Sequence, residues 1–289
     1  MVTIQTENFS LEQIWQSGQC FRMRQTEGVS EEFFREQITG RGEGRGYEII
    51  AGHRYLEAFS LGERCMLSCS KEEYEDFWKG YFDLENDYNS YISRVDPGDG
   101  YLLSAASLGW GIRILKQDLW ETLVSFLISQ QNNIVRIRRC ISNICRQYGE
   151  KRVSSGGKEY YAFPEPNALA GLKEDGLREC NLGYRSKYVV RAARSVASGE
   201  TDLARICGMG YPEAKAELLK LFGVGEKVAE CICLFALHHL EAFPVDTHIS
   251  QAMEKHYKKG FPLKRYQGIQ GVMQQYIFYY ELHGAATDR

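Results

Sequence analysis

The N-terminal part of the chain, up to about residue 112, alternates hydrophobic and polar side chains over short stretches. YEIIAGHRYLEAF (47–59) and ERCMLSC (63–69) follow this pattern, which is typical of strands with one buried face. DFWKGYFDLENDYNSYISRV (76–95) changes to helical spacing, and DPGDG (96–100) has the composition of a chain break. We therefore expect an antiparallel sheet accompanied by a helix.

The spacing of hydrophobic residues becomes helical from about Lys116 onward. Segments 117–130 and 132–149 both show it, and Gly149 is a suitable C-cap for the second. Further helices are predicted at 167–179, 184–198, 211–221, 227–238, 247–258 and 266–283. The pattern predicts an α+β protein, with an N-terminal α+β domain in residues 1–112 and an all-helical domain in residues 113–289.

The composition is that of an ordinary globular protein. The chain has 289 residues, 44% of them hydrophobic and 25% charged, and a formal net charge of −3, so it can bury a sizeable core in one or two domains. No apolar run is long enough for a membrane span, and the N-terminus lacks the features of a signal peptide. The nine cysteines have no framework spacing, which favours reduced thiols in the cytosol.

Basic residues gather locally although the net charge is slightly negative. Residues 136–152 contain six basic side chains and one acidic side chain, and RSKYVVRAAR (185–194) forms a second cluster. Both stretches lie on predicted helices. Each cluster can be a solvated helix face or a local basic face, which the net charge does not exclude.

Two predicted helices meet at the glycines of LFGVGEKVAECICLFAL (221–237). A tight Gly-x-Gly hairpin exposes backbone N–H groups at the start of the second helix, and such groups bind phosphate well. Gly223 and Gly225 permit both the turn and the close approach of a ligand backbone. A plain αα-hairpin without a ligand explains the same residues equally well.

Lys227 occupies the first turn of this second, largely apolar helix. The helix dipole is positive there, and partial burial adds a desolvation penalty, so both effects disfavour the charged ammonium. An amine that loses its proton easily is a nucleophile. The alternative is a lysine that binds phosphate as a point charge.

Asp246 precedes the next helical run, in FPVDTHIS (243–250). A carboxylate in that position is a good N-cap, and we expect Asp246 to cap this helix. A capping carboxylate can also serve a catalytic site that faces the same loop.

The hairpin followed by PVDTHI resembles the helix-hairpin-helix (HhH-GPD) DNA glycosylases. It is most similar to the 8-oxoguanine DNA glycosylase/AP lyase branch, because four other stretches match that branch in the same order over nearly the whole chain. They are SGQCFRMR (17–24), SFLISQQNNIVRI (125–137), NLGYRSKYV (181–189) and QQYIFYYEL (274–282). The resemblance implies that residues 113–289 form a helical HhH-GPD glycosylase domain.

The resemblance implies chemistry for both residues singled out above. Such enzymes bind double-stranded DNA and flip the damaged base out of the duplex. Lys227 would attack the sugar C1′ and form a Schiff base, after which β-elimination nicks the strand. Asp246 would stabilise the positive charge that develops on the sugar. The implied substrate is 8-oxoguanine opposite cytosine.

Four positions match residues that recognise the damaged base in the family. The carbonyl of Gly18 would accept a hydrogen bond from N7–H, which 8-oxoguanine has and guanine lacks. Gln274 would bind the Watson–Crick edge, while Phe278 and Cys231 would pack on the two faces of the base. Without the resemblance, a turn glycine and core packing explain Gly18, Phe278 and Cys231.

Five further matches concern the opposite strand and the backbone. Arg136 and Arg185 would bind the acceptors of the cytosine, Gln131 would fill the gap left by the flipped base, and Tyr184 would form a wedge beside it. His248 would contact a phosphate. The family's run of three asparagines is QNN (131–133) here, which leaves the stringency for the opposite base open.

The resemblance also bears on cofactors and partners. Carbonyls of Leu219, Leu221 and Val224 are a candidate site for a structural monovalent or calcium ion, and no other cofactor is required. Some relatives have an iron–sulfur cluster bound by four cysteines that follow the aspartate matched by Asp246. Here the last cysteine is Cys233, so we expect no such cluster. We expect a monomer that binds duplex DNA and no membrane, in the cytoplasm or nucleoid of a bacterium or in a eukaryotic nucleus.

Two other functions remain open from the sequence. One is a glycosylase for another base lesion, which the pocket residues and not the hairpin would decide. The other is a non-catalytic helix-hairpin-helix module that only binds duplex DNA. Lys227 and Asp246 argue against the second, because a hairpin that binds phosphate requires neither.

Overall fold

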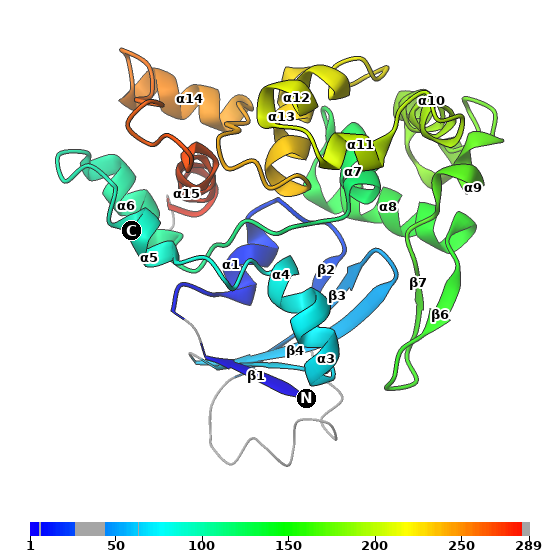
Figure 1. The fold of residues 1–289 in the computed structure, drawn as a ribbon, viewed down its shortest axis with the longest axis horizontal. Helices are drawn as coiled ribbons and strands as arrows, with labels where there is room; N and C mark the ends of the chain where they lie inside the picture. Colours follow the sequence, from blue (N-terminus) through cyan, green and yellow to red (C-terminus); the bar gives the residue numbers. More distant parts are fainter. Residues whose placement is uncertain (6, 27–43, 63, 285–289) are drawn as a thin grey trace. The chain divides into compact units, whose positions relative to one another are not determined.

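The computed structural model describes residues 1–5, 7–26, 44–62 and 64–284. Its main sheet has five strands in the order β1-β5-β4-β3-β2 (Figure 1). The strands are β1 Val2–Gln5, β2 Met23–Thr26, β3 Arg45–Ala51, β4 Arg54–Leu61 and β5 Arg64–Leu67. Val2 lies opposite Leu67, and Met23 opposite Ile49, in antiparallel pairs. The predicted antiparallel sheet is therefore confirmed; residue 63 of the predicted strand 63–69 lies outside the described residues.

The predicted helix 76–95 is interrupted in the structure. One helical stretch runs from residue 71 to 81, and a second begins at Tyr88, with Asp83 between them in a left-handed conformation at φ 53°. The predicted break at 96–100 ends in a helix, since Asp99 caps α6 by accepting a hydrogen bond from the Leu102 N–H at 2.9 Å. The elements of this region are α1 Leu11–Gln16, α3 Lys71–Glu73, the π-helix η1 Tyr74–Trp78, α4 Lys79–Tyr81, α5 Tyr88–Ile92 and α6 Gly100–Leu108.

The remaining chain is mainly helical, as predicted. Its helices are α7 Leu119–Ser129, α8 Ile134–Tyr148, α9 Pro166–Ala170, the short η2 Arg178–Cys180 and η3 Gly183–Arg185, α10 Ser186–Ala197, α11 Leu203–Cys207, α12 Tyr211–Leu218, α13 Glu226–Phe235, α14 Thr247–His256 and α15 Gln270–His283. The prediction of an all-helical domain missed a two-stranded sheet, β6 Lys151–Val153 and β7 Glu159–Tyr161. Strands this short give no clear alternation. The predicted helix 167–179 is also too long, because regular helix stops at Ala170 before Gly171.

The chain forms two compact units. The first comprises Met1–Ile49, Leu56–Lys116 and His238–Arg289, and the second comprises Ile50–Tyr55 and Gln117–Leu237. In the first, α15 packs on α6 and α14, as Figure 1 also shows. In the second, α13 packs on α7, and the Gln117 N–H donates to the Phe235 carbonyl at 3.0 Å. The predicted domains, residues 1–112 and 113–289, do not have the same boundaries as these units, and the division after residue 112 stays a prediction.

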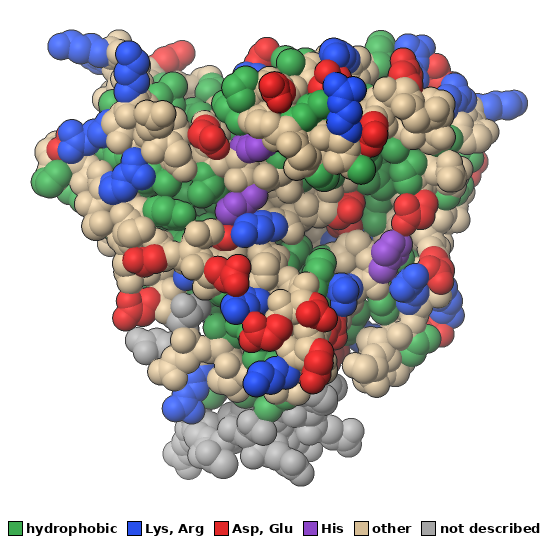
Figure 2. All heavy atoms as spheres, viewed as in Figure 1, with side chains coloured by type: hydrophobic (Ala, Val, Ile, Leu, Met, Phe, Trp, Pro, Cys, Tyr) green, Lys and Arg blue, Asp and Glu red, His purple; other side chains and the backbone are tan. Residues whose placement is uncertain are grey.

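The surface shows no separation of charge on the face drawn in Figure 2, where acidic and basic side chains are interspersed. Among the described residues, no helix combines the length and the apolar character needed to cross a membrane. The cysteines form no disulfide within the described part of the chain, and all except Cys207 are buried.

Candidate nucleic-acid interface and active site

The predicted hairpin joins α12 to α13 by a tight turn. Gly223 has a φ of +90°, and a Cβ built on it would lie 2.7 Å from the ring of Tyr188. The Val224 N–H donates to the Leu221 carbonyl at 3.0 Å, which closes the turn. Only glycine combines this left-handed backbone with such close packing, so Gly223 is required by both conformation and space.

Gly225 differs from Gly223, because its φ of −100° suits any residue. It is the N-cap of α13, and no side chain caps this helix end. Nothing lies within 4 Å of a Cβ built on Gly225. The backbone N–H groups of the first turn are therefore accessible to an anion, which the helix dipole also favours.

Lys227 lies half-buried in that first turn. Its Nζ is 5.1 Å from the centroid of the Phe126 ring, and Phe126 in turn stacks on Phe235 at 5.6 Å. A cation over an aromatic face is stabilised, so this contact opposes the helix dipole, which disfavours the ammonium. Cys231, one turn further along α13, is buried with 3% of its surface exposed.

An ion network joins α12 to α13 on the side of the hairpin. The ammonium of Lys215 lies 2.7 Å from the Glu226 carboxylate and 2.6 Å from that of Glu230. The Tyr211 hydroxyl donates to Glu230 at 2.6 Å. Burial alone would lower the pKa of Lys215, but the hydrogen bonds to both carboxylates outweigh it and raise the pKa. The network neutralises part of the acidic charge beside the open helix end.

The segment after α7 places two predicted gap residues beside each other. Gln131 is exposed and has a left-handed φ of 48°, and its Oε1 lies 3.5 Å from the hydroxyl of Tyr184, which is 43% exposed. Gln130 ties this segment to the hairpin, since its side-chain amide donates to the Gly223 carbonyl at 3.0 Å. Gln130 could not be singled out from the sequence, because its neighbour Gln131 was the residue that matched the family.

Arg136 and Arg185, the two residues predicted to bind the cytosine, differ in their exposure to solvent. Arg136 is exposed on the first turn of α8. Arg185 is only 3% exposed, stacks on Tyr184, and donates to the carbonyls of Gln130 and Gln131, each at 2.8 Å. Arg185 therefore holds the backbone of the gap segment, a role that the sequence did not indicate.

Gly18 lies in the first unit, in a loop that buried neighbours hold in place. Its φ is +74°, and a Cβ there would meet the ring of Phe278 at 3.1 Å. The buried side chain of Gln19 donates to the Ser17 hydroxyl at 2.8 Å and to the Arg113 carbonyl at 2.9 Å. Gly18 and Phe278, both predicted to contact the base, are thus neighbours within one unit.

Asp246 is confirmed as the N-cap of α14, since its Oδ1 accepts a hydrogen bond from the Ile249 N–H at 2.9 Å. Gln274 is 3% exposed, and its amide donates to the Pro244 carbonyl at 2.9 Å. The exposed ring of His248 lies edge-on to Phe278, with 6.0 Å between centroids. Four predicted residues of this unit, Asp246, His248, Gln274 and Phe278, therefore come from the loop before α14 and from α14 and α15.

The hairpin carbonyls remain a candidate ion site. The Leu221 carbonyl already accepts the Val224 N–H, but a carbonyl oxygen has a second lone pair. Leu219 and Val224 belong to the same turn. Within the described residues, no group of three or more His, Cys, Asp or Glu side chains could hold a metal.

Comparisons with known proteins cover both halves of the chain. Residues 1–123 match the family model of the 8-oxoguanine DNA glycosylase N-terminal domain, and residues 124–260 match that of the HhH-GPD superfamily of base excision DNA repair proteins. The fold is similar to the crystal structure of Clostridium acetobutylicum 8-oxoguanine glycosylase/lyase in complex with double-stranded DNA containing cytosine opposite to 8-oxoguanine. That similarity has a TM-score of 0.86 and 35% identity, over 97% of this chain and 94% of that chain.

Two curated relatives show the same similarity in sequence. The probable N-glycosylase/DNA lyase of Methanothermobacter thermautotrophicus is 29% identical over 315 residues, covering 98% of this chain and 96% of that protein. The N-glycosylase/DNA lyase of Saccharomyces cerevisiae is 38% identical over 159 residues, and the match covers 51% of this chain and 42% of the yeast protein. The chain thus spans less than half the length of the yeast relative and nearly all of the archaeal one.

Proposed function

Because this chain belongs to the family of 8-oxoguanine DNA glycosylase/lyases within the HhH-GPD superfamily, we propose that it excises 8-oxoguanine opposite cytosine and then nicks the abasic strand. The observation that carries this proposal is the position of Lys227. It lies in the first turn of α13, directly after the open helix end at Gly225. A nucleophile is thereby fixed close to a site that suits a DNA phosphate.

In the proposed reaction, neutral Lys227 attacks C1′ of the damaged nucleotide. The electrons of the N-glycosidic bond leave with the base, which takes up a proton, and the carboxylate of Asp246 stabilises the positive charge on the sugar. Loss of the ring oxygen from C1′ gives the Schiff base. Removal of a C2′ proton then expels the 3′ phosphate, so the strand is cut by β-elimination.

DNA would be anchored by groups that carry no sequence information. The N–H groups at the start of α13 suit one phosphate, with Gly223 and Gly225 allowing its approach. His248 is exposed at the start of α14 and would bind another phosphate. The hairpin carbonyls of Leu219, Leu221 and Val224 would hold a monovalent or calcium ion that supports the first contact.

Recognition of the damaged base rests on Gly18. Its carbonyl would accept the N7–H that only the oxidised base presents, so a normal guanine would leave two acceptors facing each other. Gln274 would bind the Watson–Crick edge of the base, and Phe278 and Cys231 would pack against its faces. These roles separate this function from that of a glycosylase for another lesion.

On the opposite strand, Gln131 and Tyr184 would occupy the gap and its edge. Arg136 would reach the cytosine from an exposed position. Arg185 would reach it while still holding the gap segment, because its bonds to Gln130 and Gln131 use only part of the five N–H donors of a guanidinium. We propose that the protein acts on duplex DNA as a monomer.

The test is borohydride trapping on a duplex that contains 8-oxoguanine opposite cytosine. We expect a covalent adduct with the unmodified protein and none with Lys227→Gln. Lys220→Gln is the matched control, because Lys220 lies in the hairpin before α13 but is exposed and paired with Glu217 at 2.7 Å. Adduct formation by Lys227→Gln, or its absence with the unmodified protein, would refute the Schiff-base proposal.

The same assay with other duplexes separates this function from the two alternatives, a glycosylase for another lesion and a non-catalytic module. Adenine, guanine or thymine opposite the lesion would show how far Gln131 relaxes selectivity. Duplexes with other damaged bases would reveal a glycosylase for another lesion. Binding of all these duplexes without any base release would indicate a non-catalytic module.

A further inference from the structure

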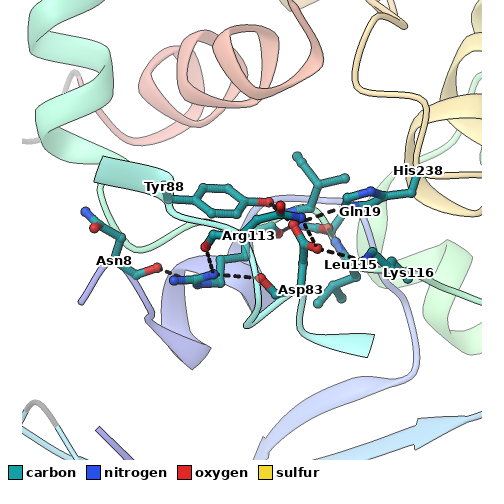
Figure 3. Close-up of polar contacts among 10 residues, drawn as sticks. Asn8, Gln19, Asp83, Tyr88, Arg113, Leu115, Lys116 and His238 are labelled. Carbon is teal, nitrogen blue, oxygen red and sulfur yellow. Dashed lines mark hydrogen bonds and ion pairs between the residues drawn. The ribbon is translucent and has the colours of Figure 1, made fainter. Parts of the chain in front are cut away.

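A buried polar cluster in the first unit has no part in the proposed chemistry. Figure 3 shows its central residues, Asp83 and Arg113, with the side chains around them. Asp83 has no exposed surface, and Arg113 is 2% exposed. Burying two charged groups is costly unless their hydrogen bonds are satisfied, so their partners indicate what the cluster does.

The carboxylate of Asp83 has four partners, two of them from distant parts of the chain. Its oxygens lie 3.0 Å from the ammonium of Lys116 and 3.2 Å from Nε2 of His238. They also accept hydrogen bonds from the Tyr88 hydroxyl at 3.0 Å and from the Asn86 amide at 2.7 Å. Burial alone would raise the pKa of Asp83, but His238 and Lys116 outweigh it and hold the pKa well below its usual range.

Asp83 and His238, which contact each other, both have a left-handed backbone. Asp83 has a φ of 53° and His238 a φ of 55°. Such left-handed conformations are unfavourable for residues other than glycine and persist only where surrounding contacts impose them. The contact between the Asp83 carboxylate and Nε2 of His238 joins these two residues, so it helps to hold the local backbone.

Arg113 binds backbone carbonyls of two other segments. Its guanidinium donates to Asn8 at 2.9 Å, to Asp83 at 2.7 Å and to Asn86 at 3.1 Å. It also lies over the Tyr88 ring, 4.6 Å from the centroid. Arg113 therefore fixes the turn that carries Asp83 against the N-terminal segment.

The Asp83 carboxylate is linked to the short segment 113–116, which contains Arg113 and Lys116. Tyr88, which donates to Asp83, accepts a hydrogen bond from the Ile114 N–H at 2.8 Å. Gln19 then binds the same segment twice, because it donates to the Arg113 carbonyl and accepts from the Leu115 N–H at 2.8 Å. Gln19 directly follows Gly18, so the buried cluster ends at the loop that presents the Gly18 carbonyl.

We propose that Asp83 is a positioning residue for base recognition, which fixes segment 113–116 and, through Gln19, the carbonyl of Gly18. The proposal rests on the role of Gly18 in the proposed function. Telling 8-oxoguanine from guanine by one hydrogen bond requires that the acceptor lie within a few tenths of an ångström of its place, because hydrogen bonds weaken steeply with distance and angle. A hydrogen-bonded cluster built around the buried side chains of Asp83 and Arg113 provides that rigidity.

The test compares two substrates that differ in whether a base must be recognised. A duplex with 8-oxoguanine opposite cytosine requires the Gly18 carbonyl, while a duplex with a preformed abasic site requires only Lys227 and the strand-cutting step. For Asp83→Asn we expect excision of 8-oxoguanine to fall about 10- to 100-fold, as for other small misplacements. Nicking of the abasic duplex should stay near the unmodified level.

Lys116→Met is a second variant that we expect to fold, since the Lys116 side chain is 38% exposed. It should reproduce the effect in weaker form. Lys79→Met is its matched control, because Lys79 is similarly exposed and also lies 3.0 Å from a carboxylate, but that of Glu75 is 48% exposed and not buried. The control should excise 8-oxoguanine normally.

Three outcomes overturn the proposal. Equal loss on both substrates, in step with a fall in the free energy of unfolding, would make Asp83 a purely structural residue. Unchanged excision by folded Asp83→Asn and Lys116→Met would remove the link to Gly18, and so would equal losses in Lys116→Met and its control. Failure of the proposed function is distinguishable, since the unmodified protein would then not release 8-oxoguanine at all.

Discussion

Replacing Gly223 by alanine tests whether the hairpin depends on the backbone conformation and the space beside Tyr188. The left-handed φ of +90° costs an alanine about 1–2 kcal/mol relative to glycine. The new Cβ would lie 2.7 Å from the Tyr188 ring, and such overpacking costs about 1–3 kcal/mol. The ring cannot move freely, because it packs edge-on against Tyr184 and Phe222. We therefore expect Gly223→Ala to lower the free energy of unfolding by roughly 2–5 kcal/mol.

Gly225→Ala, two residues away, is the matched control for the stability measurement. Its φ is ordinary and nothing lies within 4 Å of the new Cβ. An alanine N-cap costs about 0.5–1 kcal/mol. Urea denaturation measures both variants, and fluorescence anisotropy with a duplex containing an abasic-site analogue measures whether loss of the hairpin geometry weakens DNA binding.

A double-mutant cycle with Tyr188→Leu separates the two contributions at Gly223. A smaller side chain should relieve the steric part, so we expect a coupling energy of about 1–3 kcal/mol between the sites. The backbone part should remain. The reasoning is refuted if Gly225→Ala destabilises as much as Gly223→Ala, or if Gly223→Ala stays within about 0.5 kcal/mol of the unmodified protein.

Four further predictions concern Gly18, Asp246, Arg185 and Asp83. Gly18→Ala should reduce excision of 8-oxoguanine far more than nicking of abasic DNA, because its Cβ would press on Phe278 at 3.1 Å; equal rates on both substrates would contradict this. Asp246→Asn keeps a capping oxygen and should keep stability while slowing excision at least about 100-fold, whereas Asp246→Ala should also lose about 1 kcal/mol of stability in urea. Arg185→Lys should destabilise by about 2–4 kcal/mol, since a lysine cannot reproduce the bonds to two carbonyls; a neutral result in urea would show that those bonds contribute little. Burial raises the pKa of Asp83, but His238 and Lys116 outweigh it and lower the pKa. The charge of Asp83 therefore stabilises the fold above about pH 4, and this stability is lost on acidification. Between pH 6 and pH 2 the free energy of unfolding should fall less steeply for Asp83→Asn than for the unmodified protein, and an identical dependence on pH would contradict the lowered pKa.

Local sequence predicted those parts of the molecule that depend on neighbouring residues. Hydrophobic spacing identified α7, α8 and α10 to within a few residues, and a carboxylate before a helical run identified the cap at Asp246. The same local rules failed where one short stretch of residues is compatible with two structures. DPGDG (96–100) contains both a turn and the Asp99 cap of α6, so reading it as a break alone concealed a helix.

Contacts between distant segments could not be predicted from the sequence. Arg185 matched a reader of the opposite base, but its bonds to the carbonyls of Gln130 and Gln131 depend on how α7 and α10 pack. The contacts of the Asp83 side chain have the same origin. Its carboxylate lies against Lys116 and His238, and neither is near it in the chain.

The contacts of Asp83 also bear on how the chain is assembled. Lys116 is the last residue before the chain passes into the second unit, and His238 is the first residue after it returns. Both bind one carboxylate, and within the second unit Gln117 is bonded to Phe235. Apart from residues 50–55, the second unit is therefore a cassette whose entry and exit lie together. Domain insertion and circular permutation are best tolerated in such an arrangement, so this cassette is a natural unit for exchange between relatives, with the sheet and α15 as a constant frame.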